Sequence, residues 1–305
     1  MKKVKILVTG STGFVGTNFI KYVKESSNIE LDYLTREQLN SEKITIFDYD
    51  VILHLAGKAH DLKNTSKTDE YYRINFGLTK NLIDSFIESN VSKFIYISSV
   101  KAVAESVKNK LDESYQPNPF TPYGKSKLLA EKYIQEKLID SAKKFYIIRP
   151  CMIHGPGNKG NLNLLYSFVE KGIPWPLGGF MNSRSFLSIE NLCFVIREIG
   201  DRDDISSGIY NLADDESLST NTIIDIISEV IEKRIRVLKI PQSLIRILFS
   251  LGDILHLPFN MEKLDKLTES YVVDNSKILK ELGKPLPVKA VPGIKRTFKS
   301  FKSNF

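Results

Sequence analysis

The chain has 305 residues, of which 42% are hydrophobic and 26% charged, so it can bury the core of one large domain or of two smaller ones. Lysine and arginine total 43 against 36 acidic residues, and the resulting formal net charge of +7 suits anionic ligands such as nucleotides. The sequence has no arginine-rich run and no interleaving of basic with aromatic residues, so we expect no nucleic-acid partner.

The first 150 residues alternate between strand-like and helix-like patterns. Short apolar runs predict strands at residues 4–8, 29–34, 51–55, 94–97 and 145–148. Helical spacing of apolar residues predicts helices at residues 17–24, 71–89 and 123–138. This order is typical of an α/β protein with a Rossmann-type, doubly wound parallel sheet, whose ligands lie beyond the carboxyl ends of the strands.

The pattern changes after about residue 155, where glycines and prolines become frequent. Helices are predicted at residues 162–171, 189–199 and 220–233, and a last helix is predicted to end near Gly283. Strands are predicted at residues 208–212 and 235–240. We therefore expect a doubly wound α/β domain at residues 1–155, to which part of 186–212 returns, and a smaller mixed α/β domain at 156–305 that caps its ligand crevice.

Several features bear on the compartment of the protein and on metals. Cys151 and Cys193 belong to no C-x-x-C pair, and the histidines form no ligand pattern: His54, His60, His154 and His256. The N-terminus enters a strand without the apolar core of a signal peptide. Residues 244–257 are apolar, but they are too short to span a bilayer and are interrupted by Arg246 and Asp253. The sequence predicts a cytoplasmic, reduced protein without a metal site or an integral membrane segment.

A glycine-rich loop stands between the first predicted strand and the first predicted helix. Its G-x-x-G-x-x-G spacing lets the backbone turn tightly and approach a pyrophosphate at the helix N-terminus. The loop supplies the expected cofactor contacts Gly10, Thr12, Gly13, Phe14, Val15 and Gly16. The motif predicts a dinucleotide cofactor of the NAD(P)(H) type.

The end of the second predicted strand is expected to meet the adenosine ribose. An acid there binds the 2′-hydroxyl of NAD, whereas an arginine suits the 2′-phosphate of NADP. Asp32 falls too early, inside the strand, while Arg36 falls near the expected position. The pattern slightly favours NADP(H), with a plain surface role for Arg36 left open.

Tyr123 and Lys127 are four residues apart in a predicted helix that starts at Pro122. This spacing places both side chains on one helix face. A cation beside a tyrosine lowers the pKa of the phenol, so that it can exchange a proton with a substrate hydroxyl near neutral pH. The pair is therefore a candidate proton-transfer site, although the same residues also occur on ordinary helix surfaces.

Several motifs occur together in one order along the chain: Thr9-Gly10 to Gly16, His54-Leu55-Ala56-Gly57, Asn75-Phe76-Gly77-Leu78-Thr79, Ser98-Ser99, Tyr123-x-x-x-Lys127 and Arg149-Pro150. Together they resemble the extended short-chain dehydrogenase/reductases of the NAD-dependent epimerase/dehydratase type, which act on nucleotide sugars. The resemblance covers nearly the whole chain.

The resemblance implies roles for individual residues. Tyr123 would be the catalytic acid/base, Lys127 would lower its pKa and hold the nicotinamide ribose, and Ser99 would hydrogen-bond the reacting sugar oxygen. Arg184 would bind the diphosphate of a UDP-sugar, and Asn161 is either a substrate contact or a loop residue. Asn75 is expected to be a structural brace. The expected lining of the cofactor site consists of Leu55, Ala56, Gly57 and Pro150.

The motifs narrow the choice of reaction within the family. Val100-Lys101 follows Ser99 where the family's 4,6-dehydratases have an Asp-Glu pair, which argues against dehydration. The branch with the most similar motifs, including Gly155-Pro156-Gly157-x-Lys159, contains UDP-sugar 4-epimerases and 4-reductases of UDP-4-keto-6-deoxy-N-acetylhexosamines, which serve surface-polysaccharide synthesis.

We expect a 4-keto reductase first, because NADP(H) suits an enzyme that consumes its cofactor. The alternative is an epimerase of UDP-glucose or UDP-N-acetylglucosamine, and a minor alternative is a non-catalytic cofactor-binding sensor. His154 stands where the family commonly has a tyrosine, which weakens the transfer of local substrate contacts. A homodimer can form through Leu128, Leu129 and Tyr133, which can equally pack inside the subunit.

Overall fold

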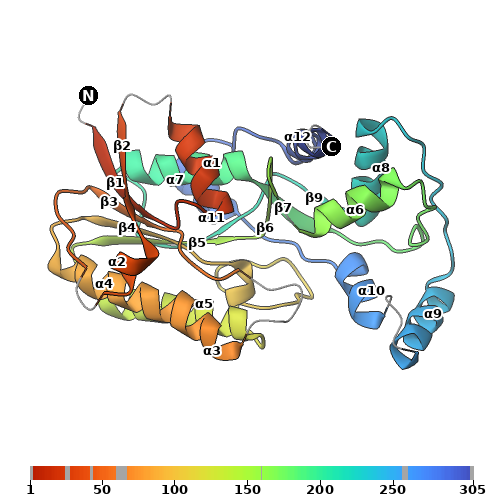
Figure 1. Ribbon diagram of the computed structural model, residues 1–305, viewed down its shortest axis with the longest axis horizontal. Helices are drawn as coiled ribbons and strands as arrows, with labels where there is room; N and C mark the ends of the chain where they lie inside the picture. Colours follow the sequence, from red (N-terminus) through yellow and green to blue (C-terminus); the bar gives the residue numbers. More distant parts are fainter. Residues whose placement is uncertain are drawn as a thin grey trace.

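The computed structural model describes residues 3–24, 28–41, 44–59, 67–158, 160–255 and 260–302 (Figure 1). His60, Lys159 and His256, which the sequence analysis named, lie outside the described residues. Within the described part, no helix is both long and apolar enough to cross a membrane.

Six parallel strands form the larger sheet, in the order β2-β1-β3-β4-β5-β8. Their bounds are β1 Val4–Thr9, β2 Ile29–Leu34, β3 Val51–His54, β4 Lys93–Ile97, β5 Lys144–Pro150 and β8 Gly208–Leu212. β2 is added on one side of β1, and β3 and the later strands are added on the other side, so the strand order reverses at β1. The predicted parallel, doubly wound sheet is confirmed.

Helices cover both faces of this sheet (Figure 1). One face carries α1 (Phe14–Val23) and α7 (Ile189–Asp201), while the other carries α4 (Leu78–Glu88) and α5 (Pro122–Leu138). Side chains of β1 alternate between the two cores, because successive residues of a strand point to opposite faces. Ile6 and Val8 pack in the core with α1 and α7, and Leu7 packs in the core with α4 and α5.

The chain between β2 and β3 contains the short helix α2 (Arg36–Leu39), and β2 is an edge strand of the sheet. The helix expected over 71–89 is divided into α3 (Thr68–Tyr71), the π-helical turn η1 (Tyr72–Gly77) and α4. A π turn widens the helix by one residue and often marks a functional site. Here it carries the buried Asn75.

A second lobe is built around a small sheet of the order β6-β7-β9, with bounds β6 Met152–His154, β7 Arg184–Ser188 and β9 Ser217–Leu218. It contains the helices α6 Asn161–Glu170, α8 Thr220–Val230, α9 Gln242–Ile254, α10 Met261–Thr268 and α12 Ala290–Lys302. Helix α11 (Ser276–Leu282) instead packs against β8 of the large sheet. The exact domain boundary at residue 155 stays a prediction.

Two expectations for this lobe are wrong. Residues 235–240 form isolated bridges from Val237 to Trp175 and from Lys239 to Leu177 instead of a strand. The helix that ends at Gly283 is not the last, because α12 follows it. Gly283 itself has the expected role: it ends α11 with a left-handed φ of 67°.

Candidate active site

The glycine loop runs from the end of β1 into α1. Gly10 has a φ of 70°, and a Cβ atom there would lie 2.6 Å from the backbone nitrogen of Ala56. A Cβ atom on Gly16 would lie 2.4 Å from the carbonyl oxygen of Gly10. Gly13 is the N-cap residue of α1, and no side chain accepts a hydrogen bond from the first N–H groups of the helix. These N–H groups therefore remain directed toward the loop. Thr12 is exposed, and Phe14 and Val15 begin the helix.

A chain of buried hydrogen bonds fixes the ends of β1 and β3 beside this loop. His54 Nδ1 lies 2.7 Å from Thr9 Oγ1, and His54 Nε2 lies 2.9 Å from Thr79 Oγ1. Burial lowers the pKa of His54 to about 3, so the ring is neutral at physiological pH. The backbone nitrogen of Ala56 donates to Thr9 Oγ1 at 3.1 Å. The Leu55-Ala56-Gly57 segment is thereby held against the glycine loop.

Asn75 acts as the expected structural brace. Its Oδ1 accepts from the backbone nitrogen of Lys58 at 2.7 Å, and its Nδ2 donates to Ser126 Oγ at 3.0 Å. A Cβ atom on Gly57 would lie 3.1 Å from Asn75 Oδ1 and 3.2 Å from Lys127 Nζ. The π turn therefore joins the end of β3 to α5, and Gly57 leaves room next to Lys127.

Lys127 reaches from α5 to the carboxyl end of β4. Its Nζ donates to the carbonyl oxygen of Ile97 at 2.9 Å and lies 4.7 Å from the ring centroid of Tyr96. Burial lowers the pKa of Lys127 to about 8, and the Glu131 carboxylate acts in the opposite direction. The ammonium group is therefore held in a place where it titrates close to neutral pH.

Tyr123 and Ser99 lie together, as the sequence predicts, and their side chains are hydrogen-bonded. The expectation that Lys127 lowers the pKa of Tyr123 does not match this structure, because burial raises that pKa. The hydrogen bond from Ser99 opposes the rise, and Lys127 is directed to Ile97. Ser99 is thus the group that favours ionisation of the phenol in this arrangement.

The N-terminus of α5, which carries Tyr123, is fixed by a residue that the sequence analysis missed. Glu105 accepts hydrogen bonds from the backbone nitrogen and the Oγ1 of Thr121, at 2.9 and 2.6 Å. Thr121 Oγ1 in turn accepts from the backbone nitrogen of Gly124 at 3.1 Å and caps the helix. Glu105 follows the Ser98–Lys101 segment by four residues but belongs to no motif, so no spacing pattern could identify it.

Glu131 is a second missed residue. It is fully buried, forms an ion pair with Arg149 and accepts a hydrogen bond from Ser98. It extends the spacing of Tyr123 and Lys127 by one further interval of four, so the helical pattern could have identified it. Arg149 precedes Pro150, which is buried at the end of β5, opposite Leu212 of β8.

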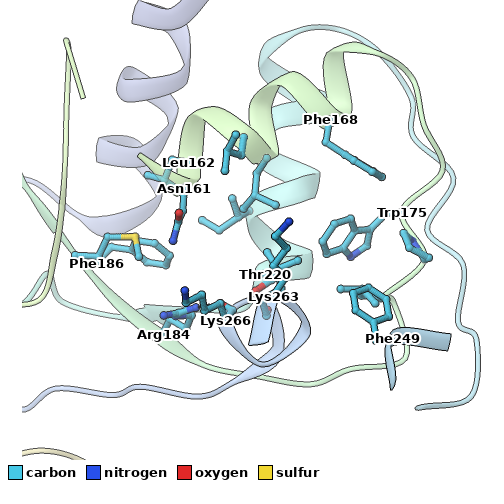
Figure 2. A pocket seen from close by; sticks show the side chains of 17 residues that line it. Asn161, Leu162, Phe168, Trp175, Arg184, Phe186, Thr220, Phe249, Lys263 and Lys266 are labelled. Atoms are coloured by element: carbon cyan, nitrogen blue, oxygen red, sulfur yellow. Dashed lines mark hydrogen bonds between the residues drawn. The ribbon is translucent and has the colours of Figure 1, made fainter. Parts of the chain in front are cut away.

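Arg184 and Asn161 line a cavity of about 380 Å³ in the second lobe (Figure 2). Arg184 lies at one end of the cavity, beside Lys266, and Asn161 lies close by (Figure 2). The Nη1 of Arg184 donates a hydrogen bond to the backbone oxygen of Lys266. The other walls are mainly apolar and include Phe168, Trp175 and Phe249, together with Thr220 and Lys263. A mainly apolar cavity that also contains several cations suits an anionic ligand with an apolar or aromatic part.

Lys101 adds a cation near Arg184. From the sequence, Lys101 was noted only because it stands where the dehydratases have an acidic residue. Burial, and then the charge of Arg184, lower its pKa to about 8. Its Nζ lies 4.6 Å from the ring centroid of Tyr271 and donates to the carbonyl oxygen of Glu105 at 2.5 Å. Arg36 lies apart from this cluster, exposed at the start of α2, immediately after β2.

The glycine loop at a helix N-terminus, the restricted space at Gly10 and Gly57, and the Tyr123–Ser99 pair all fit a bound nicotinamide dinucleotide. The model of the NAD dependent epimerase/dehydratase family matches residues 6–213. The chain belongs to this family. It is therefore an NAD-dependent enzyme of the extended short-chain dehydrogenase/reductase class that acts on nucleotide sugars.

Relatives with assigned names point in the same direction. The chain is 31% identical to a UDP-glucose 4-epimerase of Vibrio cholerae, with 97% of this chain and 95% of the relative covered. It is 27% identical to the N-acetyl-alpha-D-glucosaminyl-diphospho-ditrans,octacis-undecaprenol 4-epimerase of Escherichia coli O157:H7, with 78% and 76% covered. Both relatives are named for epimerisation at C4.

Solved structures support the fold. The UDP-glucuronic acid 4-epimerase of Bacillus cereus in complex with NAD superposes with a TM-score of 0.77 at 18% identity, over 99% of both chains. The structure called RMD from Pseudomonas aeruginosa, complexed with NADPH, superposes with a TM-score of 0.74 at 18% identity, also over 99% of both chains. These similarities show a shared architecture among proteins that hold either dinucleotide.

Proposed function

We propose that the chain is a C4-epimerase of a UDP-hexose or UDP-N-acetylhexosamine. The observation that carries the proposal is the 31% identity to the Vibrio cholerae UDP-glucose 4-epimerase along nearly the entire length of both proteins. The neighbouring Ser99, Tyr123 and Lys127 side chains supply the groups that C4 chemistry requires. The reductase, which the sequence first favoured, needs the same three groups and is the alternative.

In this proposal Tyr123 takes the proton of the C4 hydroxyl, and Ser99 hydrogen-bonds the same oxygen. The glycine loop and Lys127 would hold the nicotinamide dinucleotide, which would supply a hydride acceptor and donor for C4 without net consumption of the cofactor. Tyr123 returns its proton to the alkoxide formed on the opposite face of the sugar. Bound NAD⁺ would add positive charge near Tyr123, and this charge would offset the effect of burial on the phenol pKa.

The substrate-binding part of the proposal places the UDP diphosphate at Arg184 and the uridine in the cavity beyond it. The guanidinium can form two parallel hydrogen bonds to phosphate oxygens. Lys266 lies beside Arg184, and Asn161 lines the same cavity (Figure 2). The apolar walls then surround the base, and the sugar extends toward Tyr123.

Two further predictions remain proposals. A homodimer through α5 would use Leu129, which is 38% exposed and accessible to a second subunit. The preference for NADP(H) depends on Arg36, whose exposed position at the end of β2 allows contact with a 2′-phosphate.

The test is an incubation of the purified protein with UDP-glucose and, separately, with UDP-N-acetylglucosamine, followed by NMR of the sugar. The proposal predicts conversion to the galacto form without net consumption of added cofactor. A matched reaction supplies a UDP-4-keto-6-deoxy-N-acetylhexosamine with NADPH or NADH. Stoichiometric oxidation of the cofactor there, with no conversion of either gluco sugar, would establish the reductase instead.

A further inference from the structure

Helix α9 (Gln242–Ile254) lies at the outer end of the second lobe (Figure 1), and many of its apolar side chains are exposed. Six aliphatic side chains, between 46% and 71% exposed, form what we call the apolar stripe: Leu244, Ile247, Leu248, Leu251, Ile254 and Leu255. Single exposed aliphatic residues are common on protein surfaces, but a contiguous set marks an interaction site.

The spacing of the stripe shows that it is one face of the helix. Its members follow intervals of three and four residues, which align side chains along one side of an α-helix. A different face packs against the protein through Ile245 and Gly252, which are buried, and α9 contacts α10 there. The core of the lobe therefore does not account for the apolar stripe.

The length of α9 indicates how such a face can be used. The helix has 13 residues, which is too few to cross a bilayer but enough to lie along its surface. A helix that lies in the interface has an apolar face directed into the lipid and polar side chains on the other side. Ser243, Arg246 and Ser250 are exposed polar residues on α9 that lie outside the apolar stripe.

A basic segment leads directly into α9. Residues 233–247 contain five cations and no acidic residue: Lys233, Arg234, Arg236, Lys239 and Arg246. All five are exposed. The segment is held to the lobe by backbone hydrogen bonds, from Leu238 to the Trp175 oxygen at 2.8 Å and from Gly178 to the Leu238 oxygen at 3.1 Å. Arg246 Nη1 lies 3.9 Å from Asp265 Oδ1 of α10, and the other four cations precede the helix. A run of exposed cations that leads into an apolar helix is complementary to an anionic lipid surface.

We propose that α9 and residues 233–239 form a docking surface for an anionic membrane. The apolar stripe enters the boundary between headgroups and acyl chains, and the cations bind lipid phosphates. A symmetric contact with a second copy of the chain through the same face is less favourable, because it would bring two basic segments toward each other. The proposal concerns attachment and does not depend on which C4 reaction the enzyme performs.

The test is flotation of the full-length protein with vesicles made of equal parts phosphatidylglycerol and phosphatidylcholine. We expect the protein to float with these vesicles, and at least tenfold less to float with phosphatidylcholine alone. The double variant Ile247→Glu/Leu251→Glu should lose binding by at least tenfold. The matched control Ile139→Glu, at a site 68% exposed after the end of α5, should bind as the unaltered protein does.

A charge variant, Arg234→Gln/Arg236→Gln, tests the electrostatic part, and its binding should fall severalfold while the thermal stability of the protein is unchanged. Sedimentation velocity of the same variants without vesicles shows whether the apolar stripe instead mediates dimerisation of the protein. The proposal is overturned if the unaltered protein does not float, or if the stripe variant still does. It is also overturned if that variant only converts a dimer into a monomer.

Discussion

Glu131 of α5 and Arg149 of β5 form an ion pair in the interior of the protein, where their side chains are 0% and 3% exposed. Arg149 donates from Nε to both carboxylate oxygens at 3.1 Å and from Nη2 to one of them at 2.5 Å. The same carboxylate accepts from Ser98, which directly precedes Ser99. The pair therefore links the helix of Tyr123 to the strand ends that carry Ser99 and Pro150.

Glu131→Gln should destabilise the protein by about 3–5 kcal/mol, because it leaves the Arg149 charge buried without its counterion. The double variant Glu131→Met/Arg149→Met should lose less stability than Glu131→Met and Arg149→Met lose together, because neither charge then remains. Urea unfolding of the four proteins measures the coupling. Glu136→Gln, at an exposed position of the same helix, should change stability by less than about 0.5 kcal/mol. Strict additivity in the cycle would show that the pair is not coupled.

Tyr123→Phe should reduce turnover on the C4 substrate by about 10²- to 10⁴-fold, because the proton acceptor is removed while the ring that packs near Tyr71 remains. Steady-state kinetics, with circular dichroism as a check of folding, measure the effect. Tyr133→Phe is the matched control, because Tyr133 lies on the same helix and its hydroxyl donates to Asp84 instead. Equal activity of the two variants would refute the role of Tyr123.

The rate should fall as the pH rises above about 8, because the Lys127 ammonium, whose pKa burial lowers to about 8, then loses its proton. A neutral lysine loses the charge-assisted hydrogen bonds by which the ammonium group would hold the hydroxyls of a bound ribose. Lys127→Arg keeps the charge and should move the alkaline limb of the kcat profile to higher pH. Lys101 has a similar pKa of about 8, so Lys101→Arg is the necessary control and should leave the limb in place. If only Lys101→Arg moved the alkaline limb, the limb would have to be assigned to the titration of Lys101.

Stability should decline as the pH falls below 6.5, because His54 binds a proton in the unfolded chain at its ordinary pKa of 6.5 but only near pH 3 in the folded protein. Unfolding therefore takes up a proton across this window. The expected contribution is about 1.4 kcal/mol for each pH unit. Urea unfolding at several pH values measures the slope, which should become shallower in His54→Asn. An unchanged slope would show that His54 titrates alike in both states.

Arg36→Gln should weaken NADPH binding by about tenfold and leave NADH binding unchanged if Arg36 meets a 2′-phosphate, because an exposed charge-assisted contact is worth about 1–2 kcal/mol. Titrations followed by nicotinamide fluorescence measure both affinities. Lys21→Gln, which removes an exposed cation of α1 on the opposite face of the sheet, serves as the control. Equal loss for the two cofactors would remove the basis for an NADP(H) preference.

The sheet and its crevice could be predicted because strand ends and the glycine loop are local signals that the tertiary structure does not override. The brace at Asn75 could be predicted for the same reason, but the π turn that carries it could not. Within this turn, the Asn75 side chain hydrogen-bonds to Lys58 and Ser126, which are 17 and 51 residues away in the sequence. Glu105 was missed for an equivalent reason, because only the folded loop brings it to Thr121.

The second lobe was harder to predict. Val291-Pro292-Gly293 is typical of a turn, yet proline is also compatible with the first turn of a helix, and α12 begins at Ala290. Residues 235–240 have strand-like composition, but they meet the loop at Trp175 and form only bridges. The direction of the Tyr123 pKa shift also depends on burial, which spacing along a helix does not report.

The position of β8 has a practical consequence for anyone who wishes to express the cofactor-binding half alone. Residues 208–212 complete the large sheet beside β5, although the chain has already built β6, α6 and β7 before it returns. A fragment ending near residue 155 would leave β5, whose side chains are almost all buried, as an uncovered apolar edge. Such an edge pairs with other chains, so the fragment should aggregate while the complete polypeptide does not.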